Sequence, residues 1–298
     1  MTDDIGRPCA IDAPAKINLT LDITGRRADG YHLLRSVMQT VDLCDTVTLI
    51  PGGEGIRLTV SDETLPADER NTAWKAAALF YEAAELTPAV DILIEKRIPQ
   101  QAGMAGGSAD AAAVLRGLNK LYDRPLTDSV LLILGEKIGA DVPFCLLGGT
   151  MLAEGIGEEL TALPTLPPVW ITVVKPDVGV STAAAYAAVD SADIPLHTER
   201  ETALLAALRE GDVAGVAANV FNVFEDALAL PEVAEVKAAL AAFAPLGCQM
   251  TGSGSAVFAM FDSEDRATEA ATALEALGAT FVCRPMTAAE MELPEEEE

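Results

Sequence analysis

A glycine-rich stretch between an apolar segment and an alanine-rich segment constrains this chain more than any other feature. Residues 101–115 read QAGMAGGSADAAAVL. The segment VDILIEKRIP before them predicts a strand stopped by Pro99, and the segment after them predicts a helix over residues 107–122. Such a loop leaves backbone N–H groups unpaired at a helix start, and its small residues let a phosphate come close. Because neither G-x-x-x-x-G-K-S/T nor G-x-G-x-x-G is present, the pattern alone fits either a different phosphate cradle or tight helix–strand packing.

The rest of the chain mixes strand and helix patterns without a regular βαβ rhythm. Residues 15–24, AKINLTLDIT, alternate apolar and polar side chains, which predicts a half-buried strand. Further strands are predicted within residues 33–43, 45–50, 90–99, 150–155, 169–176, 247–261 and 280–286. Further helices are predicted within residues 71–86, 127–139, 181–190, 201–211, 231–243 and 263–277. The mixture predicts an α+β protein, and the run TALPTLPP predicts a boundary between two domains, residues 1–163 and 164–298.

The charge balance excludes several classes of partner. The 298 residues include 20 Lys+Arg against 46 Asp+Glu, a formal charge of −26, so neither nucleic acid nor an anionic membrane surface is an expected partner. An anionic ligand must therefore be bound by local groups. Part of the charge lies in the tail LPEEEE, which is predicted to be a solvated, disordered end.

Cysteine spacing and hydropathy indicate the compartment. The five cysteines lie far apart and form no C-x-x-C pair, which predicts reduced thiols rather than a disulfide framework or a zinc site. The start MTDDIGRP lacks the apolar region of an export signal, and no uninterrupted apolar run reaches the length of a membrane span. We therefore expect a cytoplasmic protein.

Four blocks, in order along the chain, resemble the signature blocks of the GHMP small-molecule kinases. They are PAKINLTLDITGRRADGYHLLRSVMQTVDLCD, IPQQAGMAGGSADAAAVLRGLN, GADVPFCLLGGTMLAEGIGEEL and MTGSGSAVFAMF. The resemblance implies a two-domain α+β fold in which ATP and substrate meet in the cleft between the domains. It also implies ATP as cofactor, with Mg²⁺ bridging the phosphates. No acidic metal site can be read from the sequence, so the metal ligands are left open.

The first block is the most specific. It resembles the branch of the family that transfers the γ-phosphoryl group of ATP to the 2-hydroxyl of 4-diphosphocytidyl-2-C-methyl-D-erythritol, a small molecule of the non-mevalonate isoprenoid pathway. A homoserine- or mevalonate-type kinase is the nearest alternative; ADGYH and Tyr186 argue against it, because those substrates carry no base to stack. A non-catalytic nucleotide-binding protein is the second alternative, and the presence of both Lys16 and Asp141 argues against it.

The resemblance assigns the glycine loop to ATP. Its backbone amides are expected to wrap the nucleotide phosphates, which requires no lysine within the loop. The expected ATP-binding residues are Pro99, Gly103, Met104, Ala105, Gly106, Gly107, Ser108 and Ala109. Two of them depart from the usual family pattern, since Ala105 stands where many members have glycine and Ala109 where many have serine. We therefore expect one hydroxyl to be missing near the phosphates, leaving Ser108 to act alone.

The resemblance also supplies a catalytic pair, Lys16 and Asp141. Asp141 is the candidate base that accepts the hydroxyl proton, while Lys16 stabilises the developing charge. A carboxylate is a weak base at neutral pH, so the proton transfer must follow or accompany phosphoryl transfer. Asp141 lies in GADVPF, where we expect Pro143 to hold Val142 extended and so end the preceding helix.

The remaining expected site residues bind the second substrate. The resemblance assigns Tyr31 and His32 to cytidine diphosphate, and Tyr186 to stacking on the cytosine from the opposite side. Asn18 shares the polar face of its strand with Lys16, and Gly252 and Ser253 match a glycine turn near the phosphates. From the residues alone, Tyr186 also fits an ordinary helix face, and the turn fits a plain hairpin. The full set of expected substrate residues is Asn18, Tyr31, His32, Tyr186, Gly252 and Ser253.

Overall fold

The computed structural model describes residues 7–291, so the predicted solvated tail LPEEEE lies outside the described residues. Residues 7–163 contain the strands β1 (Cys9–Asn18), β2 (Thr20–Arg26), β3 (His32–Pro51), β4 (Gly55–Val60), β5 (Ala89–Glu95), β6 (Thr150–Glu154) and β7 (Glu159–Ala162). The same residues contain the helices α1 (Thr72–Ala83), α2 (Gly106–Leu121), α3 (Asp128–Ile138) and α4 (Val142–Leu147).

Residues 164–291 add a second group of elements. The strands are β8 (Trp170–Lys175), β9 (Phe221–Asn222), β10 (Gly247–Met250), β11 (Val257–Phe261) and β12 (Ala279–Cys283). The helices are α5 (Thr182–Asp190), α6 (Thr198–Glu210), α7 (Val213–Ala218), α8 (Val223–Leu228), α9 (Pro231–Ala241) and α10 (Glu264–Ala273). The α+β class is confirmed. The domain boundary at residue 163 stays a prediction.

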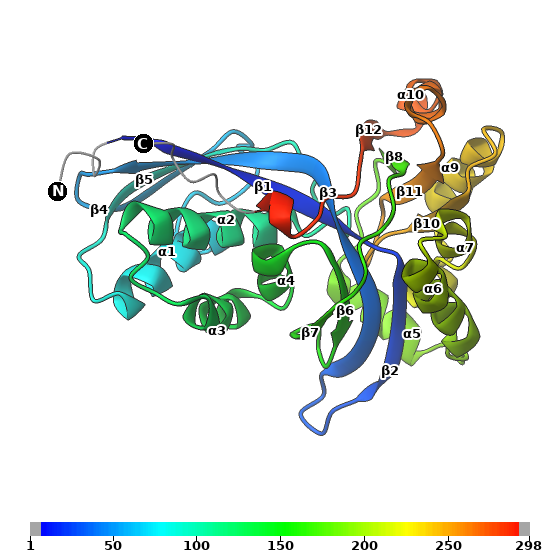
Figure 1. Cartoon of the computed structure of the whole chain (residues 1–298), viewed down its shortest axis with the longest axis horizontal. Coiled ribbons are helices and arrows are strands. Elements are labelled where there is room, and N and C mark those ends of the chain that lie inside the picture. Colours follow the sequence, from blue (N-terminus) through cyan, green and yellow to red (C-terminus); the bar gives the residue numbers. More distant parts are fainter. Residues whose placement is uncertain (1–6, 292–298) are drawn as a thin grey trace.

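The larger sheet has eight strands, in the order β4-β5-β3-β2-β9, with β1 and β6 also paired to β3 and β7 paired to β6. Helices α1 to α4 lie along one face of this sheet (Figure 1). Strand β3 is a single element of 20 residues where the sequence pattern predicts two strands. It pairs with β2 and β6 over its first part and with β1 and β5 over its second part. Strand β9 joins this sheet from the second half of the chain, through a parallel pairing with β2.

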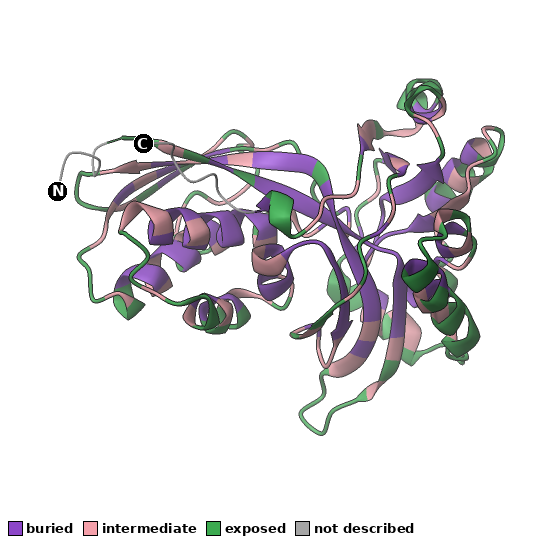
Figure 2. Ribbon diagram, in the orientation of Figure 1, coloured by how far each residue is buried: buried purple, intermediate pink, exposed green. Residues whose placement is uncertain are grey.

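The smaller sheet is antiparallel, in the order β10-β11-β8-β12. It lies at the other end of the elongated molecule, surrounded by the helices of the second half (Figure 1). Figure 2 shows that buried residues continue from α2, along β3 and into this second sheet. The alanine-rich helix α2 approaches β1 and β3 closely: a side-chain carbon added at Gly117 would lie 2.4 Å from Ile11 and 2.6 Å from Leu49. Helix α2, which begins at the glycine loop, is therefore anchored in the core.

Two local expectations are wrong. Residues 15–24 are not one half-buried strand: they span the end of β1 and the start of β2, with Leu19 between them, and Lys16, Asn18 and Thr20 on the polar face are as buried as the apolar residues. Their side chains contact β3, the residue before α4 and the turn after β10 instead of solvent. Val142 is not extended either: it begins α4, with Pro143 in the first turn, where the missing N–H costs no hydrogen bond. The preceding helix ends at Ile138.

The other strand and helix predictions are confirmed to within a few residues; β5, for example, ends at Glu95 rather than at Pro99. The sequence reading missed the short elements β4, β7, β9, α4, α7 and α8. None of the five cysteines, all of which lie within residues 7–291, forms a disulfide. None of the helices within residues 7–291 is long and apolar enough to cross a membrane.

Candidate active site

A cavity of about 610 Å³ gathers most of the predicted site residues. It is lined by β1, by the glycine loop before α2, by the residue before α4, by the start of α5, and by the turn between β10 and β11. The predicted residues that line it are Lys16, Asn18, Pro99, Gly103, Met104, Ala105, Gly106, Gly107, Ser108, Asp141, Tyr186, Gly252 and Ser253. Tyr31, His32 and Ala109 are not among the lining residues. Segments more than 230 residues apart in the chain, such as those of Asn18 and Thr251, therefore meet at one place.

Lys16 and Asp141 lie close together in this cavity. The Lys16 Nζ is 3.9 Å from Asp141 Oδ2, and the side chains are 5% and 34% exposed. Lys16 also donates to Asn18 Oδ1 at 2.6 Å, a contact that follows from the two-residue period of β1. Asn18 in turn donates to the hydroxyl of Ser36 on β3 at 2.7 Å. The ammonium group is thus fixed by neighbouring strands, whereas the carboxylate can be reached by a ligand.

The glycine loop is packed directly against the turn after β10. Gly103 has φ +73°, and a side-chain carbon there would lie 2.1 Å from the Thr251 carbonyl oxygen. Gly252 has φ +53°, and its added carbon would lie 2.6 Å from the Gly103 carbonyl oxygen. The backbone N–H of Ser255 donates to the carbonyl of Gln101 at 3.1 Å. Only glycine permits this contact, which holds the two turns in one arrangement.

The start of α2 fits an anion. Its N-cap, Ala105, has the left-handed conformation with φ 59° and ψ 29°, and no side chain caps the helix. The amides of Ser108 and Ala109 donate to the Ala105 carbonyl. The first amides of a helix, here those of Gly106 and Gly107, have no partner within it, so they are available to a phosphate at the positive end of the helix dipole. The residue that replaces the usual glycine therefore keeps a glycine-like backbone, at a strain of about 1–2 kcal/mol. Residues 103–108 are called the phosphate cradle below.

Ala109 is placed differently from its neighbours. Its side chain is buried, at 1% exposure, and packs in the core, whereas Ser108 lines the cavity. A serine at position 109 would direct its hydroxyl into this packed interior. The structure thus separates Ala109 from the other residues expected to contact ATP.

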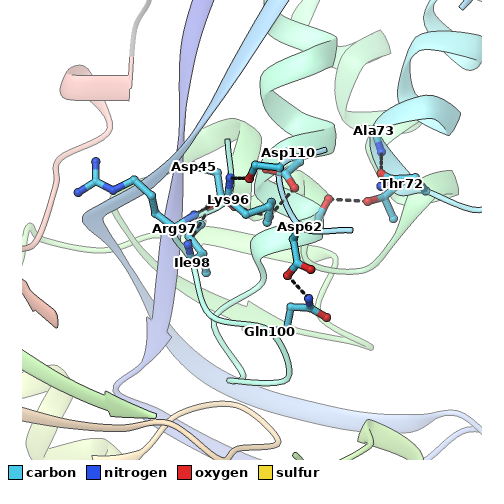
Figure 3. A network of polar contacts seen from close by, with 12 residues as sticks. Asp45, Asp62, Thr72, Ala73, Lys96, Arg97, Ile98, Gln100 and Asp110 are labelled. Atoms are coloured by element: carbon cyan, nitrogen blue, oxygen red, sulfur yellow. Dashed lines mark hydrogen bonds and ion pairs between the residues drawn. The ribbon is translucent and has the colours of Figure 1, made fainter. Parts of the chain in front are cut away.

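A buried charge network lies behind the phosphate cradle (Figure 3). Lys96 Nζ donates to Asp110 Oδ2 at 2.6 Å and also contacts the carboxylate of Asp45. The other oxygen of Asp45, a fully buried residue, accepts the backbone N–H groups of Arg97 and Ile98. A side-chain carbon added at Gly106 would lie 3.4 Å from Lys96 Nζ. The network therefore ties β3, the residue after β5 and the second turn of α2 together next to the cradle.

The charged groups in this network shift one another's pKa values. Burial lowers the pKa of Lys96, but the carboxylates of Asp110 and Asp45 outweigh it and leave that pKa raised. Burial raises the pKa of Asp110 to about 7, although the Lys96 ammonium opposes the shift. Sequence reasoning missed all three residues. The available signals were the lysine in EKRIP just before the glycine loop, and the aspartate that follows GGSA within it.

Tyr186 and Phe224 give the cavity an aromatic end, and His32 lies next to it, outside the lining. The rings of His32 and Tyr186 are stacked, with centroids 4.5 Å apart and planes 19° apart, and Tyr186 meets Phe224 edge to face at 5.0 Å. Tyr31 is 61% exposed. His32 therefore occupies a face of Tyr186, and the structure brings these two rings together without Tyr31. The expected stacking of a base between Tyr31 and Tyr186 stays a prediction.

Comparison with known proteins also indicates a small-molecule kinase. The model of the GHMP kinase N-terminal domain matches residues 71–149, and that of the C-terminal domain matches residues 204–280. A protein of Caldicellulosiruptor saccharolyticus named 4-diphosphocytidyl-2-C-methyl-D-erythritol kinase is 46% identical over 89% of this chain and 92% of its own length. A protein of Carboxydothermus hydrogenoformans with the same name is 45% identical over 93% of this chain and 97% of its own length.

Solved structures with a similar fold include kinases of the same family. A crystal structure of 4-(cytidine 5'-diphospho)-2C-methyl-D-erythritol kinase superposes with a TM-score of 0.80 at 38% identity, covering 93% of this chain and 99% of that one. A homoserine kinase from Cytophaga hutchinsonii, at 22% identity, a TM-score of 0.77 and 96% coverage of both chains, shares the fold. With relatives above 40% identity over nearly their whole length and both GHMP domains matched, this chain belongs to the 4-diphosphocytidyl-2-C-methyl-D-erythritol kinases of the GHMP kinase family.

Proposed function

We propose that this protein transfers the γ-phosphoryl group of ATP to the 2-hydroxyl of 4-diphosphocytidyl-2-C-methyl-D-erythritol. The observation that carries the proposal is the position of the Lys16–Asp141 pair, 3.9 Å apart, in a cavity with the phosphate cradle and the aromatic ring of Tyr186. A phosphate donor and a base-containing acceptor thus have separate binding surfaces, and the Lys16 ammonium and the Asp141 carboxylate lie in the same cavity. The names of the relatives support the same reaction.

The chemistry asks the protein mainly for positioning and charge neutralisation. Phosphoryl transfer passes through a loose transition state with charge spread over the phosphoryl oxygens. The amides at the start of α2 hold the nucleotide phosphates, and the buried ammonium of Lys16 stabilises the charge on the transferred group. The bond from the substrate oxygen to the γ-phosphorus forms as the bond to the β-phosphate oxygen breaks, and ADP leaves.

Asp141 receives the proton of the substrate hydroxyl. Its carboxylate, 34% exposed, faces the cavity and can pass the proton on to solvent after the product leaves. A carboxylate is a poor base toward an alcohol, so the proton moves late, once the new oxygen–phosphorus bond has made that hydroxyl acidic. Asp141 precedes α4 and makes no side-chain cap bond to that helix, so its carboxylate is free to act on the substrate.

Mg²⁺ fits this site as an ion carried by the nucleotide. Within residues 7–291, no group of three or more His, Cys, Asp or Glu side chains could hold a metal ion. Mg²⁺ is commonly held by substrate phosphates and water with only one or two protein oxygens, and the cavity offers the Ser108 hydroxyl and the Asp141 carboxylate. When bound, the ion would neutralise charge on the β- and γ-phosphates.

One assay separates the candidates. Purified protein is mixed with ATP, Mg²⁺ and either the cytidine compound, mevalonate or homoserine, and ADP release is followed. We expect turnover with the cytidine compound alone, because the aromatic end of the cavity suits a base. Efficient turnover of mevalonate or homoserine, with no response to the cytidine compound, would contradict the proposed substrate but leave the kinase reaction. ATP binding without turnover of any acceptor would favour a non-catalytic nucleotide-binding protein.

A further inference from the structure

Asn222 lies just outside the cavity, at a point where a strand, a helix and a turn meet. It is the last residue of β9 and the N-cap of α8, and it is 1% exposed. Through the parallel pairing of β9 with β2 it lies beside Leu21, which lines the cavity. A buried amide in such a place needs partners for both of its ends.

The side-chain amide of Asn222 makes three hydrogen bonds. Its Nδ2 donates to the carbonyl oxygens of Met250 and Gly252, both at 2.8 Å. Its Oδ1 accepts the backbone N–H of Phe224 at 2.9 Å. These partners fix the orientation of the amide, because two carbonyls need donors and one N–H needs an acceptor. The two ends of the amide therefore hold two different segments.

The nitrogen end holds the β10–β11 turn, residues 251–256. This turn packs on the phosphate cradle, since a side-chain carbon added at Gly252 would lie 2.6 Å from the Gly103 carbonyl oxygen. Gly252 is buried and also lines the cavity. Loss of the Nδ2 donor would remove a buried partner from its carbonyl, which is unfavourable. The position of the turn against the cradle therefore depends on this nitrogen.

The oxygen end begins α8. As N-cap, Asn222 satisfies one of the N–H groups that the first turn of a helix leaves unpaired. The residue that donates this N–H is Phe224, which lines the cavity and meets Tyr186 edge to face with ring centroids 5.0 Å apart. The position of the aromatic end therefore depends on this oxygen.

We propose that Asn222 is a positioning residue that fixes the phosphate cradle and the aromatic end of the cavity relative to each other through the two ends of one amide. The inference rests on the proposed function and deepens it, because phosphoryl transfer requires donor and acceptor at a set separation. Asn222 is not among the residues that line the cavity. Its effect on the substrates therefore passes through Gly252 and Phe224.

Substitutions can separate the two ends. Asn222→Ser and Asn222→Asp keep an oxygen that can cap α8 but lose the amide donors to the turn. We expect Kd for ATP, measured by calorimetry, to rise about tenfold and kcat to fall about tenfold or more. KM for the cytidine compound should stay within about twofold of the wild type, because the cap is kept. Asn222→Ala loses both ends and should also raise that KM, by about fivefold.

Asn219→Ser is the matched control. Asn219 lies three positions earlier, and its Nδ2 donates to the Gly215 carbonyl within the same segment at 2.8 Å. Kd for ATP and both KM values should remain at the wild-type level in this variant. A purely structural role of Asn222 would lower the fraction of active protein but leave Kd and KM of the folded fraction unchanged. Unchanged Kd for ATP in Asn222→Ser and Asn222→Asp would therefore overturn the inference.

A second measurement does not depend on turnover. The backbone N–H groups of Gly254 and Ser255, both in the β10–β11 turn, are hydrogen-bonded at 3.0 and 3.1 Å. Amide hydrogen exchange reports how often these bonds open. In Asn222→Ser we expect both amides to exchange about tenfold faster while the amide of Phe224 stays protected. Unprotected Gly254 and Ser255 amides in the wild type, or unchanged exchange in the variant, would overturn the inference.

Failure of the proposed function gives a different result. A wild type that binds ATP but does not turn over the cytidine compound would refute the proposed acceptor. The effects of Asn222→Ser on Kd for ATP and on amide exchange require no acceptor, so they would still support or overturn the hold of Asn222 on the β10–β11 turn.

Discussion

The phosphate cradle and the aromatic end of the cavity are built by different means. The cradle depends on backbone: Gly103 and Gly252 touch through main-chain atoms, and backbone hydrogen bonds join residues 101–102 to residues 255–256. The aromatic end depends on side chains, with His32 on Tyr186 and Asp190 holding His32 at partly exposed positions. A phosphate is recognised by amides that any sequence of small residues can present. A base is recognised by ring faces and by donors and acceptors that only particular side chains provide.

The cradle should therefore tolerate least the addition of a single carbon. Gly103→Ala is expected to abolish measurable ATP binding and to lower the free energy of unfolding by about 3 kcal/mol, since it combines left-handed strain with overlap against Thr251. Calorimetric titration with ATP and denaturant unfolding measure both effects. Gly211→Ala is the matched control: its φ is +71° against +73°, but nothing lies within 4 Å of the added carbon. Equal behaviour of the two variants would show that close packing at Gly103 is unimportant.

The catalytic pair lies in the same cavity as both regions and should respond in kcat rather than in binding. Asp141→Asn is expected to lower kcat by about 10²-fold or more while ATP still binds, because the hydroxyl proton loses its acceptor. Lys16→Ala should be similarly impaired, because it removes the buried ammonium beside Asp141. Steady-state kinetics measure the change in kcat, and a parallel ATP titration shows whether ATP binding is retained. Turnover of Asp141→Asn within a few-fold of the wild type would remove this residue from the mechanism.

A change at the aromatic end should affect one substrate and spare the other. Tyr186→Ala is expected to raise KM for the cytidine compound about tenfold, as loss of about 1.4 kcal/mol of stacking requires. KM for ATP should stay the same, since the phosphate cradle contains no part of α5. Measuring both KM values in one preparation supplies an internal control. A parallel rise in KM for ATP would mean that the two regions are coupled rather than independent.

The smallest effect is expected at Ala109, at the edge of the cradle. Ala109→Ser restores the residue common in the family, but the side chain is buried in the core, so KM for ATP should remain within about twofold of the wild type. Burying the added hydroxyl should lower the free energy of unfolding by about 1 kcal/mol. Ser108→Ala, at the neighbouring position that lines the cavity, is the comparison and should weaken ATP binding more. A clear gain in ATP affinity on Ala109→Ser would show that position 109 reaches the phosphates.

Much of the fold could be predicted because its signals are local. The two-residue alternation of residues 15–24 and the small residues before α2 appear within a dozen consecutive positions, and the structure has strands β1 and β2 and helix α2 there. Two predictions were wrong because contacts between distant segments changed the outcome expected from the local sequence. The polar face of residues 15–24 is buried against distant segments that include Ser36 and Asp141, and Val142 begins a new helix although Pro143 follows it.

The sequence by itself determined the glycine loop and the α+β class, since these depend on residue type and short spacing, and its resemblance to a known family supplied the Lys16 and Asp141 candidates. Only the tertiary structure decided that Lys96 lies beneath the cradle between two buried carboxylates, and that His32 rests on Tyr186. It also decided the partner of His32, which is 158 residues away in the chain. The physical reason is that backbone hydrogen bonding follows a local period, whereas contacts between distant side chains depend on how the sheets and helices pack.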